Sequence, residues 1–109
     1  MAKSSQPIAC TLTGARLQNR IDWIARIARD ALRSHERDDL TLRLRYAPDA
    51  VDSVRRMVRE EQVCCAFLEF ELQERPGELL VTINAPEAAR DLADELFAHF
   101  SGGDPTLSA

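Results

Sequence analysis

Residues 68–84 read LEFELQERPGELLVTIN, and this stretch decides the predicted fold. Apolar and polar residues alternate on both sides of Glu74-Arg75-Pro76-Gly77, which is the pattern of a strand with one buried face. Proline fixes φ and glycine permits a positive φ, so the central residues suit a turn. The stretch therefore predicts a β-hairpin that belongs to a half-buried sheet.

Two segments earlier in the chain show the same alternation. Residues 40–46 read LTLRLRY, and residues 8–12 read IACTL. Each places apolar side chains on one face and smaller or polar ones on the other, as expected of strands. Together with the hairpin, they predict one four-stranded sheet.

Helical periodicity fills the gaps between these strands. Apolar residues recur every three or four positions from residue 13 to about 35, from Pro48 toward Cys64, and from Pro86 to about 101. The predicted order is therefore β-α-β-α-β-β-α. Because every predicted strand has a polar face, we expect an α+β fold in two layers, with the helices packed on one face of the sheet.

The length and composition predict a single domain. A chain of 109 residues with 45% apolar residues is sufficient for one core. We place this domain at residues 7–101, between flexible termini at 1–6 and 102–109. Such a small domain leaves much surface exposed, so a homodimer is a candidate assembly.

The charge and the N-terminal sequence bear on partners and location. The formal net charge is −4, from 18 acids and 14 bases, which argues against direct nucleic-acid binding. No apolar run is long enough for a membrane span, and the first residues do not resemble a signal peptide. We therefore expect a cytoplasmic protein whose cysteines, Cys10, Cys64 and Cys65, are reduced thiols.

The adjacent pair Cys64-Cys65 is the strongest chemical feature of the sequence. Thiolates are soft donors that select ions such as Hg(II), Cu(I) and Zn(II). Neighbouring side chains point about 100° apart in a helix and to opposite faces in a strand. Joint ligation therefore requires the pair to lie at an irregular helix end. The alternative is that both cysteines are small, buried core residues.

Further ligands would have to come from elsewhere in the chain. Cys10 is a candidate third sulfur, since it shares the apolar face of its predicted strand. Zinc sites normally take four ligands, and His35, His99 or a carboxylate could complete one. The preferred explanation for both histidines, however, is a favourable charge near the C-terminus of a predicted helix. Glu60 and Glu61 could add hard donors, although such a pair usually forms a solvated helix face.

Residues 61–70, EQVCCAFLEF, together with the hairpin and residues 83–87, INAPE, carry a resemblance to a known family. The chain resembles small bacterial proteins with a Glu-x-x-Cys-Cys-x-Phe-Leu-x-Phe signature. Similar segments are appended to mercury-responsive-type regulators of heavy-metal resistance. The resemblance implies a role near soft-metal handling, with Cys64 and Cys65 as the matching positions. It does not imply a defined reaction.

Three functions follow as hypotheses. The leading one is a cytosolic binding protein for a soft metal ion (Hg(II), Zn(II) or Cu(I)), in which Cys64 and Cys65 are ligands and Cys10 a third. The second is a thiol enzyme or redox protein that uses one cysteine of the pair. The third is a dimerising interaction domain with structural cysteines. Phosphate-binding loops and hydrolase motifs are missing from the sequence.

Overall fold

A computed structural model describes residues 14–101 of the chain. It contains three α-helices and four strands in the order α-β-β-α-β-β-α, which confirms the α+β class. The elements are α1 (Gly14–Ala31), β1 (Leu32–Asp38), β2 (Thr41–Tyr46), α2 (Val51–Cys64), β3 (Glu69–Arg75), β4 (Glu78–Asn84) and α3 (Arg90–Phe100), with short 3₁₀ turns η2 (Pro48–Ala50) and η3 (Glu87–Ala89) before α2 and α3.

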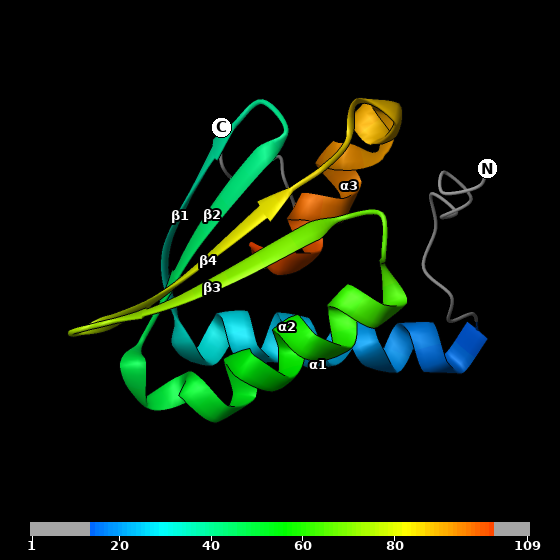
Figure 1. The fold of residues 1–109 in the computed structure, drawn as a ribbon. Helices are drawn as coiled ribbons and strands as arrows, with labels where there is room; N and C mark the ends of the chain where they lie inside the picture. Colours follow the sequence, from blue (N-terminus) through cyan, green and yellow to red (C-terminus); the bar gives the residue numbers. More distant parts are fainter. Residues whose placement is uncertain (1–13, 102–109) are drawn as a thin grey trace.

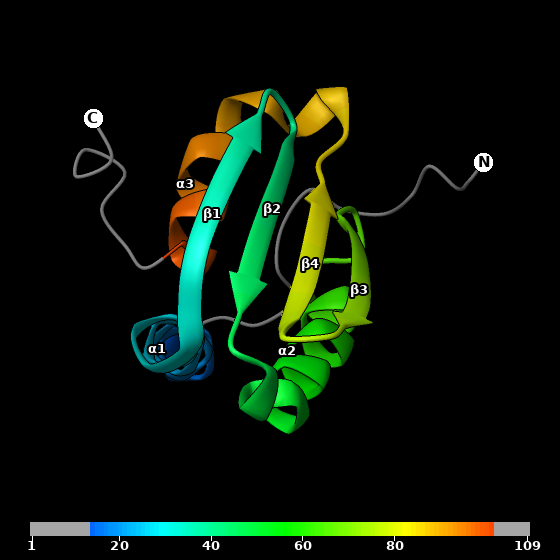
Figure 2. The same ribbon diagram turned by 90° about the vertical axis from the view of Figure 1, so that its left-hand side faces the viewer.

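The four strands form one antiparallel sheet in the order β1-β2-β4-β3 (Figure 2). The predicted hairpin is β3–β4, in which Arg75 pairs with Glu78 across the two-residue turn Pro76-Gly77. Gly77 adopts a φ of 84°, which a residue with a Cβ rarely tolerates. The central pair, β2 and β4, joins segments that lie far apart in the sequence.

All three helices pack on one face of the sheet, as Figures 1 and 2 show. The core lies between the two layers. Leu44 and Tyr46 of β2 and Val81 and Ile83 of β4 are fully buried beneath the helices. The helices contribute their own buried residues, among them Ile24, Ile27, Val54, Met57, Phe97 and Phe100. The predicted two-layer arrangement is therefore confirmed.

The outer face of the sheet carries polar side chains, as expected of an antiparallel sheet covered on one side. Arg45 of β2 forms ion pairs with Glu36 of β1, at 2.8 Å, and with Glu78 of β4, at 3.9 Å. Because β4 lies between β2 and β3, Arg45 reaches acidic side chains of its neighbours β1 and β4.

The first predicted helix extends too far. We expected it to reach about residue 35, but α1 ends at Ala31 and the chain continues as β1. β1 reads LRSHERD, in which apolar and polar residues do not alternate, so its sequence does not indicate a strand. Six of its seven residues are exposed. Its backbone ladder to β2 holds it at the edge of the sheet. The predicted strand at residues 8–12 lies outside the described residues.

The other predicted elements are close to the observed ones. α2 ends at Cys64, and the segment after Pro86 begins with η3 before α3. The proposed termini, residues 1–6 and 102–109, lie outside the described part of the chain. Within residues 14–101, no helix combines the length and apolarity that crossing a membrane requires.

Candidate metal centre

The end of α2 places Cys64 and Cys65 in one site. Cys64 is the last helical residue, and Cys65 leaves the helix with φ −117° and ψ 67°. The backbone N–H of Cys65 still donates to the carbonyl oxygen of Glu61, at 2.7 Å, and the N–H of Leu68 donates to the carbonyl oxygen of Cys65, at 3.0 Å. These bonds fix the turn that follows the helix. The pair therefore lies at the irregular helix end that joint ligation requires.

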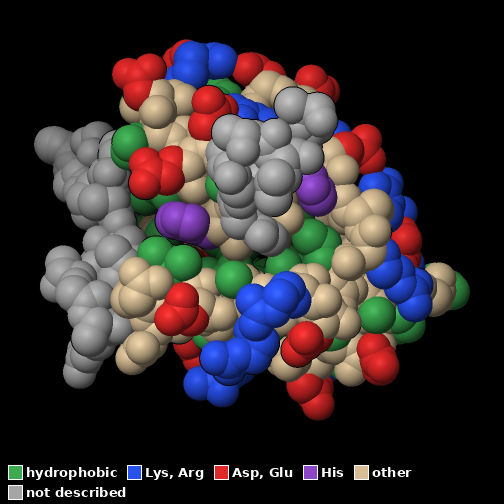
Figure 3. Space-filling model, turned by 180° about the vertical axis from the view of Figure 1, so that it is seen from behind, with side chains coloured by type: hydrophobic (Ala, Val, Ile, Leu, Met, Phe, Trp, Pro, Cys, Tyr) green, Lys and Arg blue, Asp and Glu red, His purple; other side chains and the backbone are tan. Residues whose placement is uncertain are grey.

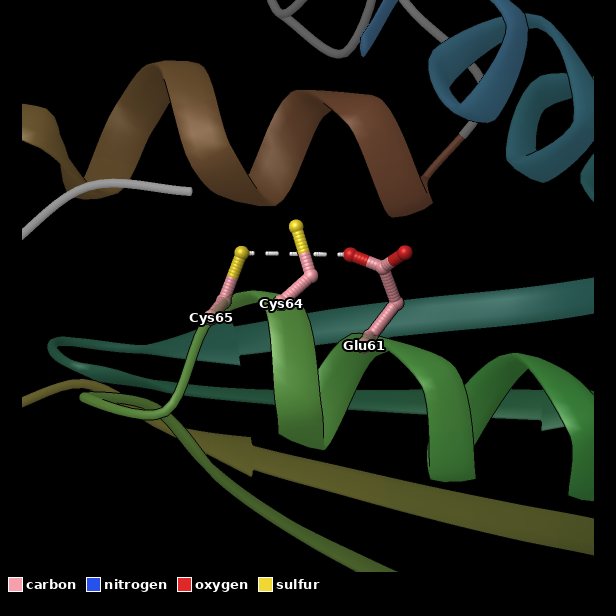
Figure 4. A group of neighbouring side chains, drawn as sticks. All are labelled: Glu61, Cys64 and Cys65. Atoms are coloured by element: carbon pink, nitrogen blue, oxygen red, sulfur yellow. Dashed lines mark hydrogen bonds between the residues drawn. The ribbon is translucent and has the colours of Figure 1, made fainter. Parts of the chain in front are cut away.

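Glu61 joins the two cysteines from one helical turn earlier. One carboxylate oxygen of Glu61 and the Sγ atoms of Cys64 and Cys65 all lie within 4.8 Å of one another. All three side chains rise from the end of α2 toward α3 (Figure 4). All three residues are buried, with exposed fractions of 3%, 4% and 5%. The structure thus brings together two soft donors and one hard donor.

Helix spacing distinguishes Glu61 from Glu60 already in the sequence. Residues three and four apart share a helix face, so Glu61 is the glutamate in register with both Cys64 and Cys65. Glu60, its neighbour, is half-buried and points instead to the arginines Arg20 and Arg56. The prediction that gave both glutamates the same role therefore holds as a donor for Glu61 alone.

Arg20 of α1 balances the buried charge of Glu61. Its Nη1 atom donates to Oε2 of Glu61 at 2.8 Å, and its Nη2 atom lies 3.1 Å from Oε1 of Glu60. Burial raises the pKa of Glu61, and the hydrogen bond and charge of Arg20 act in the opposite direction. This ion pair also links α1 to α2 across the site.

Cys65 is a buried free thiol. Its Sγ atom lies 3.9 Å from Oε1 of Glu61 and can donate a weak hydrogen bond to it. Burial, followed by the negative charge of Glu61, raises the pKa of Cys65 to about 12. The thiol therefore stays protonated at neutral pH, unlike the low-pKa thiols of reactive cysteines.

Cys64 differs from its neighbour because it is disulfide-bonded. We had expected reduced thiols throughout, so for Cys64 this prediction is wrong. The prediction inferred oxidation state from location and an odd number of cysteines, whereas a disulfide depends on the distance and orientation of two sulfurs. Cys10, the predicted third ligand, lies outside the described residues. Ligation by both Cys64 and Cys65 consequently requires Cys64 to be reduced.

Gln62 holds the turn after the cysteines against the sheet. Its Nε2 atom donates to the carbonyl oxygen of Leu68 at 2.6 Å, and its Oε1 atom accepts the backbone N–H of Phe70 at 3.0 Å. One side chain thereby satisfies two backbone groups where β3 begins. A lone glutamine in a helix carries no sequence signal that predicts this role.

A cavity of about 280 Å³ lies beside the three donors, between α1, the end of α2 and α3. Its lining residues are Arg20, Ile21, Ile24, Glu61, Cys65, Leu92, Glu95, Leu96, His99 and Phe100. Figure 3 shows apolar side chains gathered across this face of the molecule. The walls of the cavity are thus mainly apolar, and Glu95 and His99 of α3 add polar groups to the lining besides Arg20, Glu61 and Cys65.

The two histidines take different places. His99 lies in the last turn of α3, as predicted, and lines the cavity. His35 was expected near the C-terminus of the first helix, but it lies exposed on β1 because α1 ends four residues earlier. Neither histidine belongs to the compact donor group of residues 61, 64 and 65.

Comparisons with protein-family models, with curated proteins and with solved structures find no match for this chain. The resemblance to the Glu-x-x-Cys-Cys signature proteins therefore stays a prediction. The chemistry of the site itself is therefore the basis for a function.

Proposed function

We propose that the protein binds a soft, thiophilic metal ion through Cys64, Cys65 and Glu61, with Cys10 as a candidate further ligand. The observation that carries the proposal is the spacing of the three donor atoms, all within 4.8 Å and all buried. Thiolate donors favour Hg(II), Cu(I) and Zn(II) over hard cations. The resemblance in sequence supports a role in heavy-metal resistance.

Charge supports a divalent ion. Metal binding displaces the thiol protons, so in the reduced, metal-bound site two thiolates and the carboxylate of Glu61 carry three negative charges, and the adjacent Arg20 supplies one positive charge. Uncompensated charge in a buried site is unfavourable, so the remaining two negative charges call for a cation of equal charge. Hg(II) and Zn(II) meet this requirement, whereas Cu(I) leaves one negative charge.

The disulfide at Cys64 favours a second candidate, a thiol redox protein. An external dithiol would reduce the disulfide at Cys64 to two thiols and would itself become a disulfide. However, burial raises the pKa of Cys65 to about 12, so this thiol is a poor attacking group at neutral pH. Rapid alkylation of Cys65 in the folded protein would favour the redox candidate over metal binding.

The third hypothesis, a dimerising interaction domain, stays a prediction. The outer sheet face that would form such an interface carries ion-paired side chains, including Arg45 with Glu36. This composition is typical of a solvated face. A dimer would show stability that depends on protein concentration.

A metal titration tests the proposal. The fully reduced protein is titrated with Hg(II), Zn(II) and Cu(I). Binding of Hg(II) and Cu(I) is followed by the ultraviolet absorbance of thiolate-to-metal charge transfer. Binding of Zn(II) is followed by competition with a chromophoric chelator. We expect stoichiometric binding that the Cys64→Ser/Cys65→Ser variant loses. Equal behaviour of the two proteins, with thiols that resist alkylation until unfolding, would contradict the metal and redox proposals together.

Glu61 and Glu60 supply a matched pair of variants. Glu61→Gln removes one donor and should weaken metal binding at least about tenfold, which corresponds to about 1.4 kcal/mol. Glu60→Gln removes the same charge from the neighbouring position, outside the donor group, and should leave the affinity nearly unchanged. Cys10→Ser tests whether a third sulfur contributes.

A further inference from the structure

We infer that the ligand of Cys64 and Cys65 is a soft atom that carries one organic substituent, as in a monosubstituted arsenic(III) compound. The cavity receives this apolar substituent. The inference rests on the proposed function, since it requires both sulfurs as ligands. It extends that function by naming the chemical class of the ligand.

The size of the cavity is the first argument. A cavity needs about 10–15 Å³ to hold one water molecule, whereas this one measures about 280 Å³. A bare ion bound directly to Glu61, Cys64 and Cys65 would leave nearly all of this volume unused. The volume approaches the lower end of small-molecule sites, which begin at about 300 Å³.

The walls are the second argument. Ile21 and Ile24 of α1 face Leu92, Leu96 and Phe100 of α3 across the cavity. An apolar space of this kind favours an apolar group, because burial removes hydrocarbon surface from water. A hydrated inorganic ion or a sugar-like ligand is polar and does not match the five apolar side chains of these walls.

The position of the thiol is the third argument. Cys65 lines the cavity at the same end as Glu61, and the sulfur of Cys64 lies within 4.8 Å of both donor atoms. Figure 4 shows the three side chains directed from α2 toward α3, whose residues form the opposite wall. A ligand bound at the sulfurs would therefore extend its substituent between the helices.

Monosubstituted arsenic(III) has a valence that suits this arrangement. A dithiol first reduces the disulfide at Cys64 to thiols and itself becomes a disulfide. Phenylarsine oxide then reacts with the thiols of Cys64 and Cys65 to form two As–S bonds, and the two thiol protons leave with the oxide oxygen as water. The As–C bond and the oxidation state of arsenic do not change. Both Cys64 and Cys65 are consumed as ligands, and the third position on arsenic keeps the phenyl group.

The test compares phenylarsine oxide with its methyl analogue on the full, reduced protein. Each compound is competed against the same small dithiol, and the bound fraction is measured by intact-protein mass spectrometry. Because the dithiol undergoes the same As–S chemistry, the comparison isolates the effect of the substituent. We expect the protein to prefer the phenyl compound at least tenfold over the methyl compound.

Two exposed apolar residues give a matched pair of variants. Leu92→Trp introduces bulk at the cavity wall, and Val63→Trp introduces the same bulk at an exposed position outside it. The preference should fall at least fivefold in Leu92→Trp and persist in Val63→Trp. Ile21→Phe provides a second filling variant if Leu92→Trp does not fold.

The outcomes separate the two proposals. If Hg(II) binds through both cysteines but the phenyl preference is absent, or if neither filling variant reduces it, the inference about the cavity is overturned and metal binding stands. If neither arsenical nor any of the three metal ions binds, both proposals fail.

Discussion

At the scale of single residues, Arg20 determines how Glu61 is tolerated in the interior. The carboxylate is 3% exposed, and Arg20 reaches it from another helix. Replacement by Gln leaves the carboxylate without a cationic partner. We predict that Arg20→Gln lowers the free energy of unfolding by about 3 kcal/mol. This value is the lower end of the range for broken buried ion pairs, and we choose it because Glu61 can take up a proton and so lose its charge.

Urea unfolding of a double-mutant cycle measures this effect. In Arg20→Gln/Glu61→Gln the buried charge is absent, so most of the lost stability should return. A loss below 0.5 kcal/mol in Arg20→Gln, about that of an exposed pair, would show that Arg20 does not balance Glu61.

Gln62 provides a second prediction at this scale. Gln62→Ala removes both hydrogen bonds that its side chain makes to the backbone of Leu68 and Phe70. We expect a loss of about 1–3 kcal/mol, the range for leaving buried polar groups unsatisfied. Gln18→Ala is the control, because Gln18 makes an exposed hydrogen bond to Asp22. Equal stability of the two variants in urea would contradict the role of Gln62.

The cysteine pair shows how much of the site can be predicted from the sequence. Its place at the end of a helix could be predicted, because the apolar periodicity breaks before Leu68. The contribution of Glu61 follows from helix geometry once the helix is known to reach Cys64. The oxidation state of Cys64 and the contacts of Arg20 and Gln62 could not be predicted, because they depend on which segments meet in space.

At the scale of elements, Arg90 fastens the turn between β1 and β2 to the start of α3. Its guanidinium donates to Asp39 in the turn and to Glu87 in η3. These hydrogen bonds lower the pKa of both carboxyl groups. A carboxyl group with a lowered pKa in the folded state adds stability above its unfolded pKa, and this stability is lost as the pH falls through the folded value.

We therefore predict that Arg90→Gln is less stable than the wild type at pH 7 and that the difference shrinks as the pH falls below about 4.5. Urea unfolding at a series of pH values measures it. Arg59→Gln, on the exposed side of α2, controls for the loss of one positive charge. A difference that is constant from pH 7 to pH 3 would refute the linkage to Asp39 and Glu87.

The elements differ in how readily their sequences predict them. The β3–β4 hairpin has strict alternation and a Pro-Gly turn, so its own residues specify it. β1 has neither, since its strand conformation is imposed by the hydrogen bonds of β2. Because β1 lacks apolar alternation, the predicted first helix extends four residues past Ala31 and wrongly includes His35.

At the scale of the whole molecule, the donor group and its cavity link all three helices. Arg20 belongs to α1, the three donors to the end of α2, and the opposite wall to α3. The two-layer form could be predicted from the polar faces of the strands. The strand order could not, because β2–β4 pairing joins distant segments whose alternation fits several neighbours equally well. The cytoplasmic location and the absence of nucleic-acid binding stay predictions.

Metal binding should stabilise the entire domain. A ligand that binds the folded state alone, at one hundred times its dissociation constant, adds about 2.7 kcal/mol. We predict a gain of this size for the reduced protein with Zn(II), measured by urea unfolding. The Cys64→Ser/Cys65→Ser variant should show no gain, and Zn(II) removal by a chelator should reverse it. An equal gain in both proteins would locate binding elsewhere.

X-ray absorption at the zinc edge of the reduced, stoichiometric Zn(II) complex tests the central claim most directly. Coordination by Cys64, Cys65 and Glu61 predicts two sulfur atoms at about 2.3 Å together with oxygen or nitrogen at about 2.0–2.2 Å. A first shell made of oxygen and nitrogen alone would contradict the claim, because neither cysteine would then be a ligand.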